Sequence, residues 1–132
     1  MKSRDRVPLA LFTLRISIFV VMLMWTLDKL IDPDHAALVF EKFYQISGFE
    51  QVYFYIIGIA ELALLLAFLV GYKKTISYGL VFIFHAISTL SSYNQYLDPY
   101  TYPNLLFFAA WPMLAACFTL YYLREYDTKL VV

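Results

Sequence analysis

Only one cysteine and two histidines occur among the 132 residues, and charged side chains are scarce. The single cysteine, Cys117, allows no intramolecular disulfide, no CxxC redox pair and no multi-cysteine metal site, so a thiol relay within the chain is excluded. The ten basic and ten acidic residues cancel, and there is no basic run with interleaved aromatic side chains. The sequence therefore gives no indication of a nucleic-acid partner.

Apolar residues are what the sequence has in excess: they make up 62% of the chain, while charged residues make up 15%. A soluble domain carries about half apolar and roughly a quarter charged residues. The apolar residues form long blocks, and about 20 such residues, each rising about 1.5 Å, are needed to cross roughly 30 Å of hydrocarbon. We place four membrane spans at residues 9–31, 52–71, 75–93 and 104–123.

The spans must be helical, because lipid offers no hydrogen-bond partner to backbone N–H and C=O groups. We therefore predict an all-α integral membrane protein, a four-helix bundle that forms a single domain over residues 1–132. The lipid bilayer is its expected surrounding.

Basic residues predict the orientation of the spans, because cytoplasmic loops carry an excess of lysine and arginine. The two tails and the loop between the second and third spans contain Lys2, Arg4, Arg6, Lys73, Lys74, Arg124 and Lys129. The loops on the opposite side contain Lys42 alone, beside five acidic residues. We expect both termini in the cytoplasm.

The first outer loop contains the start signal of a short helix. Asp32 is a suitable N-cap and Pro33 suits the first helical position, while Ser47 and Gly48 supply a stop. We predict an interfacial helix here, which either lies over the mouth of the bundle as a lid or rests among lipid headgroups.

Prolines mark two further features. The second outer loop, LDPYTYPN, has two of them and predicts an ordered, non-helical turn. Inside the fourth span, Pro112 removes one helical hydrogen bond and predicts a kink near Phe108.

Several ionisable residues lie inside the predicted spans, where arginine, lysine or aspartate costs about 2.5 to 3.5 kcal/mol at a helix centre on insertion scales. Glu61 is midway along the second span, so we expect it to face the bundle interior. His85 lies at a similar depth on the third span, which predicts a Glu61–His85 hydrogen bond. Arg15 and Lys29 fall on one stripe of the first helix, and we expect Arg15 to reach toward Glu61. The candidate ligand-binding cluster, open to the outer face, comprises Arg15, Lys29, Glu61, His85, Ser88 and Ser92.

Two interpretations of this cluster stay open. In the first, Arg15, Glu61 and His85 neutralise one another and fix the register of the helices. In the second, they bind the polar head of a membrane-soluble ligand or convey protons. Haem is disfavoured, because the other histidine, His35, belongs to an outer loop. We expect neither haem nor a metal ion.

Several short motifs resemble the DoxX family of bacterial membrane proteins. They are LRISIF in the first span with Asp28 and Lys29 at its outer end, DPDHAAL in the first outer loop, and GIAELALLLAFLVG in the second span. The resemblance covers about residues 11–95, and the fourth span agrees only in hydropathy. The matching positions are Arg15, Lys29, Gly58 and Glu61.

The resemblance implies a multi-pass protein of the bacterial inner membrane, similar to MauE-like maturation proteins and to membrane subunits of thiosulfate:quinone oxidoreductase. Since the chain has no cysteine pair, any redox step would need an external electron donor. Our leading hypothesis is a non-catalytic subunit or maturation factor of a membrane-associated redox complex, with no intrinsic cofactor and a protein partner at its outer loops. The alternatives are a quinone-binding oxidoreductase subunit acting at Arg15, Glu61 and His85, and a small-molecule or proton transporter.

Overall fold

The computed structural model describes residues 3–43 and 51–132, and within these ranges the chain is all-helical, with no β-strand. The elements in chain order are α1 (Ser3–Ile31), α2 (Pro33–Phe43), α3 (Gln51–Leu69), α4 (Lys74–Ser91), α5 (Tyr93–Leu97), the 3₁₀ helix η1 (Asn104–Ala109), α6 (Ala110–Tyr122) and the 3₁₀ helix η2 (Arg124–Tyr126). The predicted all-α class is confirmed.

Three helical segments of the described chain are long and apolar enough to cross a membrane: Arg4–Ile31, Val52–Leu69 and Asn104–Tyr122. Only 17%, 22% and 11% of their most apolar windows are buried inside the molecule. A water-soluble protein does not leave so much contiguous apolar surface open to solvent. These helices therefore indicate a membrane protein whose outer surface contacts lipid.

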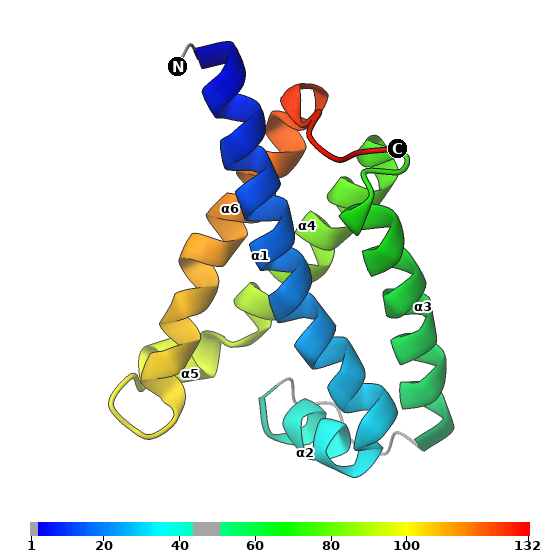
Figure 1. The fold of residues 1–132 in the computed structure, drawn as a ribbon. Helices are drawn as coiled ribbons and strands as arrows, with labels where there is room; N and C mark the ends of the chain where they lie inside the picture. Colours follow the sequence, from blue (N-terminus) through cyan, green and yellow to red (C-terminus); the bar gives the residue numbers. More distant parts are fainter. Residues whose placement is uncertain (1–2, 44–50) are drawn as a thin grey trace.

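α1 runs through the middle of the view in Figure 1 and contacts α2, α3 and α6. α1 packs mainly against α3, and α4 packs mainly against α6. Both termini lie at the same end of the molecule, here called the terminal end, while α2 and the loop at 98–103 lie at the opposite end, here called the loop end (Figure 1). The buried apolar core consists of Leu11, Ile18, Leu65, Phe68, Tyr78, Val81, Cys117 and Leu120.

The short helix of the first outer loop forms as its start signal predicts. Pro33 is the first residue of α2, and the His35 backbone N–H donates to Asp32 Oδ1 at 3.3 Å, as an N-cap requires. The predicted stop at Ser47 and Gly48 lies outside the described residues. The helix is confirmed, whereas its place at a membrane interface remains a prediction.

The third and fourth predicted spans differ most from the observed helices. The third span was expected to run through Tyr93, but α4 ends at Ser91 and the short helix α5 begins at Tyr93, on the far side of Ser92. In the fourth span the expected single α-helix is in two parts, which meet at Ala109 and Ala110, next to the predicted kink near Phe108. A 3₁₀ helix precedes α6, which begins at Ala110, so Pro112 lies in the first turn of α6, where a missing N–H costs little.

The loop between α5 and η1 is the ordered, non-helical turn that its prolines predict. Thr101 Oγ1 donates to Asp98 Oδ2 at 2.8 Å, and Asn104 Nδ2 donates to the Asp98 carbonyl at 2.8 Å. Asp98 thus fixes both ends of the turn.

Candidate functional site

Arg15 of α1 is buried, with 1% of its surface exposed, and it binds the C-terminal segment. Its Nη1 donates to both carboxylate oxygens of Asp127 at 2.7 Å. Its Nη2 donates to the carbonyls of Lys129 at 2.6 Å and Leu130 at 3.2 Å. The prediction that Arg15 reaches toward Glu61 is wrong, because the chain after α6 folds back over the terminal end and supplies a closer carboxylate.

Asp127 is fully buried and gathers donors from two helices. Besides Arg15, the Tyr78 hydroxyl of α4 donates to Asp127 Oδ2 at 2.5 Å, and Lys74 Nζ donates to the Asp127 main-chain carbonyl. Phe68 packs edge-on against the Tyr78 ring, with ring centroids 5.1 Å apart, and so helps to fix the hydroxyl. We call Arg15, Tyr78 and Asp127 the terminal-end cluster.

Sequence reasoning missed Asp127, because this acid lies beyond the last predicted span in a tail that looks solvated. One signal was present: a buried arginine needs an acidic partner, and the tail that follows the fourth span supplies Glu125 and Asp127.

Lys29 and Glu61, two members of the cluster predicted from the sequence, form an ion pair. Lys29 Nζ lies 3.0 Å from Glu61 Oε2, and Thr26 Oγ1 donates to the same oxygen at 3.0 Å. The side chains of Lys29 and Glu61 are 12% and 27% exposed, so this pair is reachable from outside, unlike Arg15 and Asp127. We call Thr26, Lys29 and Glu61 the loop-end cluster.

Close packing of α1 on α3 explains why Glu61 faces α1. Gly58 lies one helical turn before Glu61, and a Cβ placed there would stand only 2.7 Å from Leu30 Cδ2. The absent side chain lets the two helices approach at this point, next to Lys29. The Glu61 carboxylate therefore points toward α1, where it meets Lys29.

The expected Glu61–His85 hydrogen bond does not form. His85 Nε2 lies 3.1 Å from the Ala110 carbonyl at the start of α6, and this nitrogen must donate, because a carbonyl oxygen only accepts. α4 packs mainly against α6, which turns His85 away from α3.

The remaining predicted residues form a third group along α4. His85 and Ser92 are buried, and so is Thr89 between them. The hydroxyls of Thr89 and Ser92 donate back to the carbonyls of His85 and Ser88, at 2.7 and 3.2 Å. These side chains face the interior as expected, but their hydroxyl protons are used by their own helix.

The single cluster predicted from the sequence is thus three separate groups. Arg15 and Lys29 share α1, but at about 1.5 Å of rise per residue they lie about 21 Å apart along its axis. One ligand headgroup cannot touch both. In the described part of the chain, no three His, Cys, Asp or Glu side chains are grouped so that they could hold a metal ion.

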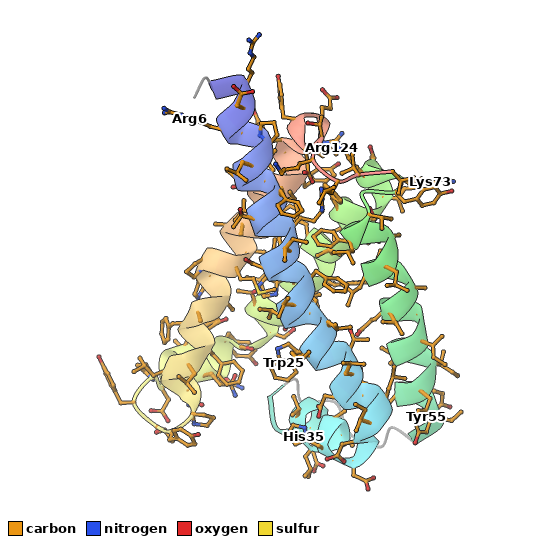
Figure 2. All side chains as sticks on the ribbon, viewed as in Figure 1. Arg6, Trp25, His35, Tyr55, Lys73 and Arg124 are labelled. Carbon is orange, nitrogen blue, oxygen red and sulfur yellow. The ribbon has the colours of Figure 1, made fainter. Side chains whose placement is uncertain are left out.

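Several basic side chains lie at the terminal end. Figure 2 shows Arg6, Lys73 and Arg124 at the terminal end, whereas Tyr55 and His35 lie at the loop end. His35 Nδ1 lies 2.8 Å from Asp28 Oδ1, so α2 is tied to the last turns of α1.

The partly exposed loop-end cluster is the candidate functional site, since it offers an ammonium and a carboxylate within reach of a molecule in the lipid. In the terminal-end cluster, by contrast, the charges of Arg15 and Asp127 are paired with each other and buried. No family model, curated protein or solved structure matches the chain.

Proposed function

We propose that this chain is a DoxX-like four-helix protein of the bacterial inner membrane that serves as a non-catalytic subunit or maturation factor of a membrane-associated redox complex. The fourth crossing in this proposal is α4, whose 18 residues span about 27 Å at 1.5 Å per residue. An even number of crossings agrees with the two termini lying at one end (Figure 1). The basic residues of that end favour a cytoplasmic location for it.

The observation that carries the proposal is the exposed apolar surface at the loop end. Between α5 and η1, Tyr100 and Tyr102 are 89% and 87% exposed. Neighbouring exposed side chains are Leu97, Leu105 and Leu106. Because Asp98 holds this loop in one ordered shape, the surface is presented rigidly. Tyrosine is among the residues that most often contribute the binding energy at a protein interface.

Site-specific photo-crosslinking tests this proposal. We would place a benzophenone amino acid at Tyr100 and, as the matched control, at Tyr72, an exposed tyrosine beside Lys73 near the terminal end. The expected result is a covalent adduct at Tyr100, and not at Tyr72, with one protein that contains a flavin, a haem or an iron–sulfur centre. Adducts with lipid alone, or the same adducts at both positions, would contradict the proposal.

A second candidate function, quinone binding by an oxidoreductase subunit, is favoured by the loop-end cluster. Lys29 can donate a hydrogen bond to a quinone carbonyl, and Glu61 beside it can exchange a proton. The partial exposure of both side chains gives a lipid-soluble molecule access to them. Electrons would have to come from a partner protein.

Quinone extracted from purified protein, compared between wild type and Lys29→Met, tests this candidate. The charge of Lys29 is lost in the variant while most of its length is kept. A several-fold loss of bound quinone is expected. Equal quinone content in both proteins, or none in either, counts against quinone binding.

A further inference from the structure

The terminal-end cluster divides into a receptor made by helices and a ligand made by the C-terminal segment. Arg15 comes from α1, and Lys74 and Tyr78 come from α4. The side-chain hydrogen bonds that these three residues donate within the described chain all end on Asp127, Lys129 or Leu130, in a segment, 127–132, that forms no helix or strand. Residues 127–132, here called the strip, therefore cover side chains that belong to α1 and α4.

The receptor side chains also contact aromatic rings that belong to helices. Phe68 packs against the Tyr78 ring, and the Arg15 guanidinium lies 5.4 Å from the centre of the Phe12 ring. Phe12, Phe68, Arg15 and Tyr78 all belong to helices, so both donors have contacts that do not involve Asp127.

The donors match the chemistry of a carboxylate. Arg15 Nη1 reaches both oxygens of the Asp127 carboxylate and the Tyr78 hydroxyl reaches one of them, all at 2.5 to 2.7 Å. Such short, charge-assisted bonds are the strong ones. One donor is left over: Arg15 Nε is buried and has no hydrogen-bond partner. The receptor therefore offers more donors than Asp127 uses.

A groove lies beside the strip. It has a volume of about 400 Å³ and is lined by Arg4, Val7, Pro8, Glu125, Tyr126 and Thr128. Tyr126 and Thr128 flank Asp127 in the chain, so the groove follows the segment on both sides of the residue that enters the receptor. Its lining holds one cation, Arg4, and one carboxylate, Glu125.

We propose that Arg15 and Tyr78 form a carboxylate-binding site that the chain fills with its own Asp127, so that residues 127–132 compete with external carboxylate ligands for this site. Tethering gives Asp127 a high effective concentration, at least in the millimolar range, so the intramolecular ligand prevails until it is removed or outcompeted. The proposal does not depend on the loop-end surface or on the redox role.

Chemical rescue by acetate tests the proposal. In Asp127→Ala the receptor loses its ligand but keeps its donors, and thermal unfolding of the purified protein in detergent would be followed in acetate and in chloride at equal ionic strength. We expect the variant to unfold at a lower temperature than wild type in chloride, and acetate to restore several degrees of the loss in a saturable manner. Wild type should show no difference between the two salts.

Two controls locate the effect. Adding Arg15→Gln to Asp127→Ala should abolish the rescue, and Asp98→Ala, which removes a carboxylate from the loop end, should show none. If Asp127→Ala is not recovered folded in chloride, recovery of folded protein in acetate becomes the readout, with Asp127→Asn carried alongside. The proposal is overturned if acetate acts no better than chloride, if neither variant is recovered in either salt, or if the rescue persists without Arg15.

Discussion

Arg15 and Asp127 are 112 residues apart in the sequence, yet their side chains meet in an ion pair of 2.7 Å with almost no exposure to solvent. The pair joins the first long helix to the last segment of the chain. Its carboxylate also receives the Tyr78 hydroxyl, so α1, α4 and residues 127–132 are held at one point. This contact helps to hold residues 127–132 against the terminal end.

Breaking this pair on one side should be costly. Arg15→Met leaves Asp127 buried without its cation, and Asp127→Leu leaves Arg15 buried without its anion, so each should lower the free energy of unfolding by about 3 to 5 kcal/mol. The double variant should lose less than either single one, because no uncompensated charge remains. Denaturation in mixed micelles measures all three, and additive losses would show that the two side chains do not depend on each other.

The Tyr78 hydroxyl should contribute separately. Tyr78→Phe keeps the ring against Phe68 and removes only the donor to Asp127, so a loss of about 1.5 to 3 kcal/mol is expected for a hydrogen bond to a charged group. Tyr122→Phe, at an exposed position on α6, is the matched control and should be neutral. Equal effects in the same unfolding assay would mean that the hydroxyl bond is unimportant.

The Lys29–Glu61 pair should be coupled more weakly than Arg15–Asp127. Both side chains keep partial exposure, and polar contacts between membrane helices average about 0.6 kcal/mol, with values up to about 1.7 kcal/mol. A double-mutant cycle with Lys29→Met and Glu61→Gln should give a coupling energy in this range. If the coupling energy of Lys29 with Glu61 exceeded that of Arg15 with Asp127, the expectation that the more buried pair is coupled more strongly would be wrong.

The contact between Gly58 and Leu30 should be sensitive to one methyl group. A Cβ at residue 58 would stand 2.7 Å from Leu30 Cδ2 and 2.8 Å from Cγ, so Gly58→Ala should destabilise the protein by about 1 to 3 kcal/mol. Adding Leu30→Ala makes room and should recover part of the loss. Gly79→Ala, where the nearest atom is Tyr121 Cε2 at 3.3 Å, should have the smaller effect in the same denaturation experiment.

The topology can be read with cysteine labelling in intact cells. Cys117 is buried, so we expect the native protein to react little with maleimide. Tyr100→Cys at the loop end should react with a membrane-impermeant maleimide added outside, while Thr128→Cys at the terminal end should react only after the membrane is opened. Labelling of both residues from outside would contradict a common cytoplasmic location of the termini.

The sequence was a good guide wherever local pattern decides structure. The apolar blocks predicted the long helices, and Asp32 with Pro33 predicted the start of α2 to the residue. It was a poorer guide in the fourth span, because the change from the 3₁₀ helix η1 to α6 at Ala110 places Pro112 in the first turn of α6 and not in the middle of a long α-helix.

What the sequence alone determined is that apolar helices of membrane-spanning length form and that certain charged side chains inside them need partners, since both follow from composition and the cost of burying charge. Which partner each charge finds was decided only by tertiary structure. Glu61 faces Lys29 because Gly58 brings α3 against α1, His85 faces α6, and Arg15 receives Asp127 because the chain after α6 folds back over the terminal end. Helical spacing fixes the side of a helix on which a residue lies, but the packing of distant segments decides what that side meets.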